Sequence, residues 1–298
     1  MAKCLFVSIG CHQVTLDITI WDVQHGAAAY IRTPSGKTIV VDLGVGAAKS
    51  RTEFSPLLHL KERYGVQALD EVIITHPHRD HLDDIFNFDT VSPRVLRAPK
   101  HLSEEEIWAG NQQADKAIIE KYLEISRRYS HPVEPQNNPE RPENNGGVEL
   151  QIFVPTTSSK TNLNNHSLIA FLTFAESTIL IPGDNEEPSW RELLQYDSFR
   201  QTLKKCDILL APHHGRQAGY CADLFEYFKP RLTIVSDGPA TETTAVSQYV
   251  AKAIGWTVHK RSGGQEERKV VTTRSDGVIN VKFGHSGNGG RFIQVTAD

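Results

Sequence analysis

Four potential metal ligands lie within six positions of this chain, directly after a short apolar segment. Residues 70–75 have the composition of a buried strand, and the run that follows is His76-Pro77-His78-Arg79-Asp80-His81. Neutral imidazole and carboxylate groups are the usual ligands of zinc and similar divalent ions. A polar surface loop that merely contains many histidines is the alternative, and the density of ligands disfavours it. The run predicts a metal-binding loop at the end of a strand.

Three further apolar segments end in side chains of the same kind. Val40-Val41 leads to Asp42, residues 179–182 lead to Gly183-Asp184, and residues 208–212 lead to His213-His214-Gly215. An aspartate at a strand end is often only a turn residue. Strand ends at one edge of a sheet can also converge on a shared cleft, where function is commonly located. Four such ends in one chain favour the second interpretation.

The order of predicted elements indicates a layered fold of strands and helices. Strands are expected near 14–23, 27–33, 37–42 and 70–75, with helices at 55–65 and 103–129 and a Pro-, Asn- and Gly-rich loop at 132–147. The second half adds strands near 149–154, 167–174, 177–182, 207–211, 231–236, 256–259, 269–273 and 278–283, and helices near 221–228 and 243–254. This order predicts an α/β (α+β layered) chain, an αββα sandwich of two mixed β-sheets flanked by helices. We expect a single domain over residues 1–298, with a helical and loop insertion at about 103–147.

Composition and charge restrict where such a chain would act. The 298 residues are 39% hydrophobic and 23% charged, and no apolar run approaches the about 20 residues of a membrane span. The residues from Met1 show no signal-peptide pattern, and the four cysteines lack metal-finger spacing. We therefore expect a cytoplasmic protein with free thiols and no membrane partner. A net charge of −4 gives no overall attraction to nucleic acid, and the basic stretches at 94–101 and 260–274 are interpreted as solvated faces.

These motifs together resemble the metallo-β-lactamase superfamily. The resemblance rests on His76-x-His78-x-Asp80-His81, then Gly183-Asp184, then His213-His214-Gly215. Within that superfamily, the chain is similar to the hydrolase domain of the bacterial competence DNA-uptake channel protein and its stand-alone relatives. That similarity is carried by residues 22–28, 33–37, 41–42, 165–168 and 230–236. It extends over roughly residues 16–283 and implies the metallo-β-lactamase fold.

The chain departs from the pattern of that branch at three places. His25 stands where glutamine is usual, Ala27 replaces an aspartate, and Leu82-Asp83-Asp84 follows His81 in place of a His-x-Gly-Gly segment. None of these changes removes a metal ligand. They leave the substrate, rather than the metal chemistry, open.

The resemblance implies a site for two divalent ions, Zn²⁺ or Mn²⁺, with ligands drawn from all four strand ends. The first ion is implied to bind His76 and His78, and the second Asp80, His81 and His214, with Asp184 bridging both. His166 falls near the place where many members carry a third histidine on the first ion, a ligand that this branch often lacks. Asp42 is expected to orient a ligand histidine without binding metal.

The implied chemistry is hydrolysis with a metal-bound hydroxide as nucleophile. Asp80 is the candidate to orient the nucleophile, and His213 to donate a proton or contact the transition state. The leading hypothesis is a phosphodiesterase or nuclease that acts on a phosphodiester substrate, with nucleic acid as a candidate. The alternative is a hydrolase of a small carbonyl substrate such as a lactone, thioester or β-lactam. A third hypothesis is a metal-binding module without catalysis. A basic groove around the metals would favour the first, a closed apolar pocket the second, and exposed apolar patches the third.

Overall fold

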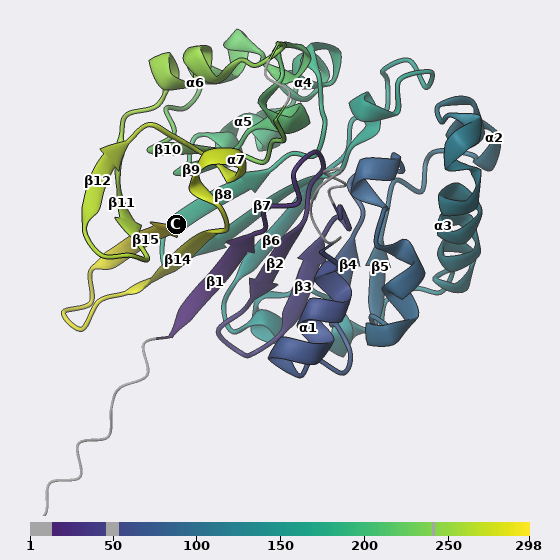
Figure 1. Ribbon diagram of the computed structural model, residues 1–298, viewed down its shortest axis with the longest axis horizontal. Helices are drawn as coiled ribbons and strands as arrows, with labels where there is room; N and C mark the ends of the chain where they lie inside the picture. The colour runs from purple at the N-terminus through teal and green to yellow at the C-terminus, as the bar shows by residue number, and fades with distance from the viewer. Residues whose placement is uncertain (1–13, 46–53, 240–241) are drawn as a thin grey trace, which may run out of the picture.

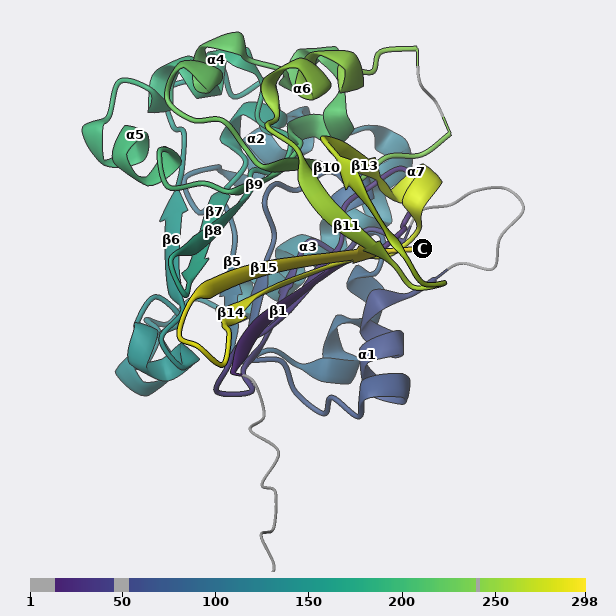
Figure 2. The ribbon, with the colours of Figure 1, turned by 90° about the vertical axis from the view of Figure 1, so that its left-hand side faces the viewer.

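The computed structural model describes residues 14–45, 54–239 and 242–298 (Figure 1). Two mixed β-sheets pack face to face, and helices cover both outer faces (Figures 1 and 2). The predicted αββα sandwich is therefore confirmed. The expected free thiols Cys206 and Cys221 are unpaired and buried, whereas Cys4 and Cys11 lie outside the described residues.

The larger sheet has nine strands in the part of the chain that the structure describes. In spatial order they are β12 (Gln265–Arg268), β11 (Trp256–Lys260), β15 (Arg291–Ala297), β14 (Ile279–His285), β1 (Thr15–Ile20), β2 (Ala29–Arg32), β3 (Thr38–Val41), β4 (Glu71–Ile73) and β5 (Val95–Arg97). The smaller sheet has six, in the order β13 (Val270–Thr272), β10 (Leu232–Val235), β9 (Ile208–Leu210), β8 (Ser177–Ile181), β7 (Ile169–Phe174) and β6 (Glu149–Phe153).

Each sheet buries side chains on both faces, which produces three apolar layers. The layer between the sheets includes Leu16, Ile18 and Ile20, which alternate along β1 with less buried residues as a half-buried strand requires. A second layer lies under α1 (Pro56–Tyr64), α2 (Glu104–Ala109) and α3 (Lys116–Arg128) on the larger sheet. The third lies under α4 (Glu187–Leu193), α5 (Asp197–Leu203) and α6 (Val246–Lys252) on the smaller sheet. A further short helix, α7 (Thr273–Asp276), follows β13.

Helix α1 begins and ends where its sequence signals predict. The hydroxyl of Ser55 accepts a hydrogen bond from the backbone N–H of Leu58, and Pro56 occupies the first turn, where no N–H is needed. Gly65 ends the helix with a left-handed φ of 68°, a conformation that costs glycine little.

The predicted helix over 103–129 is wrong as a single helix, because the chain breaks at Gly110 into α2 and α3. A Cβ atom at Gly110 would lie 2.4 Å from Cγ of Leu163, so the backbone passes too close for any side chain. Asn111 then donates its side-chain N–H to the carbonyl of Pro77, at 3.0 Å, inside the histidine-rich loop. The interruption therefore supports the loop at which the sequence places metal ligands.

Other differences lie in the C-terminal half. The predicted helix at 221–228 is a 3₁₀ segment over Ala222–Glu226, and the helix near 243–254 is the shorter α6. Strands β12 and β15 were not expected, because they are short or follow the last recognisable apolar run. Strand β15 pairs with β14 over six residues, and it joins β11 and β12 to the rest of the larger sheet.

Parallel pairing brings the four predicted strand ends to one edge of the sandwich. Strands β3, β4 and β5 are parallel in the larger sheet, and β8, β9 and β10 are parallel in the smaller one. The carboxyl ends of parallel strands lie at the same edge of a sheet. The segments after β3, β4, β8 and β9 accordingly meet there. Among the described residues, no helix is long and apolar enough to cross a membrane.

Candidate metal centre

Asp42, which follows β3, fixes the start of the histidine-rich loop. One carboxylate oxygen accepts the backbone N–H of Thr75 at 2.7 Å, and the other accepts the Thr75 hydroxyl at 2.8 Å. The second oxygen also lies 2.8 Å from Nδ1 of His81. Asp42 is fully enclosed and adopts a left-handed φ of 59°, which aspartate tolerates better than most residues. Its contacts leave Nε2 of His81 free to face the strand ends.

Two glycines hold the backbone of Asp80 against neighbouring segments. A Cβ atom at Gly26 would lie 2.6 Å from the carbonyl oxygen of Asp80, and one at Gly44 would lie 2.7 Å from the same atom. The N–H of Ala27 approaches that oxygen to 3.3 Å. Larger residues at these two positions would displace the short 3₁₀ turn Arg79–His81 that presents Asp80.

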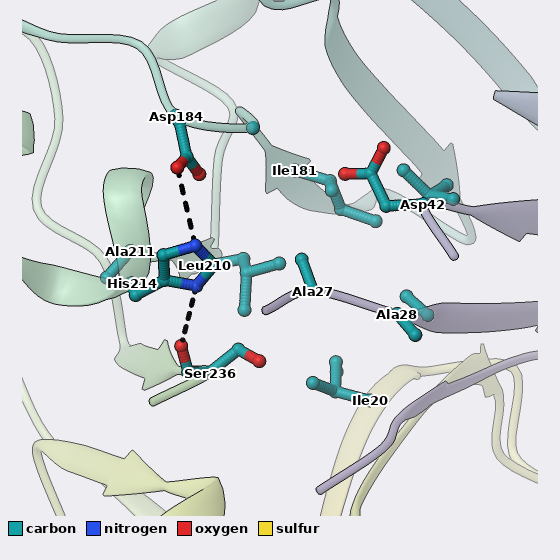
Figure 3. A pocket seen from close by; sticks show the side chains of 13 residues that line it. Ile20, Ala27, Ala28, Asp42, Ile181, Asp184, Leu210, Ala211, His214 and Ser236 are labelled. Atoms are coloured by element: carbon teal, nitrogen blue, oxygen red, sulfur yellow. Dashed lines mark hydrogen bonds and ion pairs between the residues drawn. The ribbon is translucent and has the colours of Figure 1, made fainter. Parts of the chain in front are cut away.

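Four of the predicted ligands form one compact cluster, which we call the carboxylate half of the site: Asp80, His81, Asp184 and His214. Their potential ligand atoms all lie within 4.8 Å of one another. Nε2 of His214 is 3.2 Å from Asp80 and 3.3 Å from Asp184, and Nε2 of His81 is 3.2 Å from Asp184. Figure 3 shows His214 between the Asp184 carboxylate and Ser236, whose carbonyl lies 3.1 Å from Nδ1 of His214.

The carboxylates of Asp80 and Asp184 set the charge of the carboxylate half. Burial by itself would lower the pKa of His214, but Asp184 and Asp80 outweigh it and raise that pKa to about 10. Burial likewise opposes charge on His81, and the nearby carboxylates raise its pKa well above the usual value. The pKa of Asp184 is held well below its ordinary value, because His214 and His81 overcome its own burial.

His76 and His78 form the imidazole half of the site. Nε2 of His76 lies 3.0 Å from Nδ1 of His78, a separation that two ring nitrogens directed at one ion would also have. His76 is fully buried, and burial together with the adjacent rings of His81 and His78 holds its pKa well below the usual value. Burial also lowers the pKa of His78. Both rings are therefore neutral near pH 7, the form that binds metal.

His166 lies at the end of a 3₁₀ turn before β7 and is not part of the four-residue cluster. The chain beside it is close to the loop, because the N–H of Leu168 donates to the carbonyl of Thr75 at 2.8 Å. Nδ1 of His166 lies 3.0 Å from Nε2 of His101. Within the described residues, Nε2 of His166 is buried without a hydrogen-bond partner.

The turn His213-His214-Gly215 has an unusual backbone. His213 and His214 both adopt left-handed φ values, 50° and 52°, which are rare for residues with large side chains. The turn directs the two side chains differently. His214 points into the carboxylate half, whereas the ring of His213 is 20% exposed, with Nδ1 3.1 Å from Glu186 and Nε2 3.9 Å from Asp184.

Four residues beside the site were missed by sequence reasoning as functional candidates: His25, His101, Glu186 and Arg216. Nε2 of His25 lies 3.5 Å from Asp80, and its ring packs against His214 with centroids 5.0 Å apart. Glu186 follows Gly183-Asp184 by two positions, so its proximity to that strand end was the available signal. His101 sits in a basic stretch interpreted as a solvated face, and nothing local distinguishes it.

The two basic stretches are largely neutralised by neighbouring acids rather than gathered at the site. Arg97 binds the buried Glu71 at 2.9 Å and Glu140 at 2.7 Å. Arg268 binds Glu266 at 2.7 Å and Asp276 at 3.0 Å. Neither arginine is available as part of a continuous basic surface.

The donor set of this site fits divalent metal ions. It combines imidazole nitrogens with carboxylate oxygens, the mixture that zinc and manganese both accept. Within the described part of the chain, Nε2 of His166 is buried without a hydrogen-bond partner. An unpartnered buried nitrogen costs about 1–3 kcal/mol, so a bound ion would satisfy an atom that protein groups leave unsatisfied.

The αββα sandwich and this His/Asp cluster define a metal-dependent hydrolase. The chain belongs to the metallo-beta-lactamase superfamily, whose family model matches residues 21–231. Recombination protein 2 of Haemophilus influenzae is 23% identical to this chain over 227 residues. That match covers 75% of this chain but 24% of the relative, so the chain spans about a quarter of that relative's length.

Solved structures of similar proteins have low sequence identity. A diphosphatase from the PhnP family is 12% identical, with a TM-score of 0.38 and coverage of 75% of this chain and 87% of that one. The dizinc quorum-quenching lactonase AidC, solved with a product N-hexnoyl-L-homoserine, is 15% identical with a TM-score of 0.37, covering 81% of this chain and 78% of that one.

Proposed function

We propose that this chain is a metal-dependent phosphodiesterase, with nucleic acid as the substrate to test first. The observation that carries the proposal is the shape of the space in front of Asp80. An open cleft of about 550 Å³ lies there, lined by polar and charged residues that include His25, Arg79 and Asn111 together with the acids Asp83 and Asp115. An apolar cavity beneath the site, beside Ile20 and Ala28, measures about 20 Å³ and is too small for an organic substrate.

Six side chains are proposed as metal ligands, and a seventh is considered. His76 and His78 would hold one ion, and Asp80, His81 and His214 the other. Asp184 lies among the second group and would serve both ions, as the resemblance implies. His166 would add its unpartnered Nε2 to the first. Two bound divalent ions would supply Lewis acidity, lowering the pKa of a coordinated water and neutralising charge that develops on phosphate oxygens.

Asp80 and His213 are the proposed catalytic residues. Asp80 is partly exposed to the cleft, and its Oδ2 lies beside His214 at 3.2 Å, so its position is fixed. A carboxylate in that place can orient a nucleophile and accept its proton. His213 is partly exposed, and Glu186 lies 3.1 Å from its Nδ1, which leaves Nε2 directed toward Asp184 at 3.9 Å. His213 would donate a proton to the leaving oxygen.

The residues around the ligands are proposed to keep this geometry. Asp42 holds Nδ1 of His81, and the carbonyl of Ser236 lies 3.1 Å from Nδ1 of His214. Such contacts fix the ring tautomer, so that Nε2 presents its lone pair to the ion. We propose a supporting role for these two residues, with no contact to substrate.

The test is cleavage of bis-p-nitrophenyl phosphate and of labelled single- and double-stranded DNA, with Zn²⁺ and separately with Mn²⁺. The comparison variant is Asp80→Ala, and the control is Asp223→Asn, which removes an exposed carboxylate beside Arg191. Metal-dependent cleavage that Asp80→Ala abolishes and Asp223→Asn keeps would support the proposal. No cleavage by protein that binds its ions would overturn it. Turnover of lactones, thioesters or β-lactams would then identify a carbonyl hydrolase, and no turnover at all a binding module.

A further inference from the structure

Arg216 follows the His213-His214-Gly215 turn and stands at the edge of the site without a counter-charge. Its side chain is half-buried, and its guanidinium approaches Nδ1 of His25 at 3.5 Å. Within the described residues, no carboxylate forms an ion pair with it. A guanidinium beside an anion-processing site and free of acidic partners is well suited to bind a phosphate group.

A single imidazole separates this guanidinium from the proposed catalytic carboxylate. His25 turns Nδ1 toward Arg216 and Nε2 toward Asp80, with 3.5 Å on each side. The His25 side chain is 52% exposed, so the Arg216–His25–Asp80 row borders solvent. A substrate whose scissile phosphate faces Asp80 would therefore extend past His25 before it meets Arg216.

The backbone of Arg216 is fixed on both sides. Arg216 forms an antiparallel bridge with Thr244, and its N–H donates to the carbonyl of His213 at 2.9 Å. The N–H of Gln217 donates to Thr243 and that of Ala245 donates to Gly215, both at 2.7 Å. The guanidinium thus extends from a rigid segment, which reduces the entropy lost when it binds an anion.

The cleft in front of Asp80 has an arginine of its own, Arg79, but its charge is already neutralised. Nε of Arg79 lies 3.0 Å from Asp83, and its Nη1 lies 3.7 Å from Asp115. Both acids line the cleft beside α2 and α3. An anionic chain would be repelled on that side and attracted on the Arg216 side.

We propose that Arg216 is a specificity-determining residue that binds the phosphate next to the scissile one in an oligonucleotide. The inference rests on the proposed phosphodiesterase function and refines its substrate class. It predicts that the enzyme prefers a chain of phosphodiesters to an isolated one, and that this preference depends on the charge at position 216. An isolated diester positioned at Asp80 carries no second phosphate for Arg216 to bind.

The test compares wild type, Arg216→Gln and Arg216→Lys on bis-p-nitrophenyl phosphate and on a fluorescein-labelled single strand of ten thymidines. For Arg216→Gln we expect KM on the oligonucleotide to rise about tenfold with kcat within twofold. On bis-p-nitrophenyl phosphate both constants should stay within twofold of wild type. The slope of log affinity against log salt should become shallower by about 0.7, because one phosphate contact on a single strand is lost. The Arg216→Lys variant should show a smaller rise in KM on the oligonucleotide than Arg216→Gln, because it keeps the positive charge.

Arg63→Gln is the matched control, since it removes the same charge from an exposed position in α1. Unchanged oligonucleotide kinetics in Arg216→Gln would overturn the inference, as would equal losses on both substrates or the same loss in Arg63→Gln. If wild type cleaves neither substrate, the proposed function fails, and fluorescence anisotropy with the same oligonucleotide then decides the inference separately. Tenfold weaker binding by Arg216→Gln would then uphold Arg216 as a phosphate contact of a bound oligonucleotide, and equal binding would overturn that contact as well.

Discussion

The carboxylate half and the imidazole half of the site lie side by side but differ in how they balance charge. In the carboxylate half, Asp80 and Asp184 raise the pKa values of His81 and His214 and offset their burial. In the imidazole half, Asp184 and Asp80 oppose the shift only weakly, and burial with the neighbouring rings lowers the pKa of His76. The first half is self-compensated by ion pairs, whereas the second consists of neutral rings only.

This difference implies that carboxylates, rather than the number of histidines, would distinguish the two proposed ion positions. A cation entering the carboxylate half gains two negative ligands but must replace ion pairs that already exist. A cation entering the imidazole half finds ligands that need no deprotonation, yet only two of them are in contact. Asp184 is the residue through which the imidazole half would gain a negatively charged ligand.

Asp184→Asn should have the largest effect, because it removes charge from the residue proposed to serve both halves. Asparagine keeps the shape of the side chain, so folding should be retained. We expect kcat/KM for phosphodiester cleavage to fall by roughly 10³-fold or more, with loss of bound metal. Steady-state kinetics and elemental analysis of the same sample measure both effects. Retention of two ions and full turnover would show that the halves do not depend on Asp184.

His76→Ala should separate the two halves. It removes one of the two rings in the imidazole half and leaves the carboxylate half intact. We expect one ion per chain to remain, and cleavage to fall by roughly 10²-fold. Equilibrium dialysis with Zn²⁺ counts the ions, and His214→Ala serves as the reciprocal variant. Loss of both ions in His76→Ala would contradict the division of the site.

Asp42→Asn should weaken the carboxylate half indirectly. Asparagine tolerates the left-handed backbone at this position, but it no longer offers a carboxylate to Nδ1 of His81. Loss of such a supporting contact typically costs about 10–100-fold in metal affinity or activity. Competition with a chromophoric chelator measures the affinity. An affinity equal to that of wild type would mean that Asp42 serves the fold alone.

His166→Ala tests whether the imidazole half has a third ligand. If the unpartnered Nε2 of His166 completes that half, metal affinity should weaken about tenfold there while the carboxylate half keeps its ion. The matched variant is His101→Gln, which retains a polar group opposite Nδ1 of His166. Metal titrations followed by calorimetry resolve the two ions. A titration curve identical to that of wild type would exclude His166 as a ligand.

Glu71→Gln should leave activity within twofold and change only how stability depends on pH. Burial raises the pKa of Glu71 from 4.5 to about 7, even though Arg97 opposes the shift. Because the folded-state pKa is the higher one, its stabilising contribution is complete below pH 4.5 and is lost as pH rises through 7. The difference in unfolding free energy between variant and wild type should therefore grow in favour of the variant by roughly 3 kcal/mol from pH 4.5 to 8.

Urea unfolding at several pH values provides that measurement for Glu71→Gln. Glu149→Gln is a suitable control, because Glu149 is exposed on β6. A difference that stays constant with pH would show that Glu71 does not titrate in this range. A difference that grows with pH would identify Glu71 as a buried titrating group outside both halves of the site.

Most of the fold could be predicted from the sequence, because its signals are local. Ser55, Pro56 and Gly65 define the ends of α1, and alternation of apolar residues defines β1. The division of α2 from α3 could not be predicted, since it depends on the contact of Gly110 with Leu163, 53 positions away along the chain. Strand β15 was missed for a similar reason, because its pairing with β14 is the main factor that makes it a strand.

Part of the candidate site could also be predicted from the sequence. The contacts that could not be predicted join residues far apart along the chain. Residues at strand ends were recognisable, since Asp184 and His214 each follow an apolar run. Which of them approach each other depends on parallel pairing in two sheets, and sequence reasoning alone gave no distances. His101 and Arg216 were missed because their roles arise only from contacts with His166 and His25.

The central claim is that both halves together hold two divalent ions and hydrolyse phosphodiesters. The most direct test is to titrate metal-free protein with Zn²⁺, and in parallel with Mn²⁺, while counting bound ions and following cleavage of bis-p-nitrophenyl phosphate in the same sample. We predict two ions per chain and cleavage that reaches its maximum when both are bound. Two bound ions without cleavage, or fewer than two ions at saturation, would contradict it.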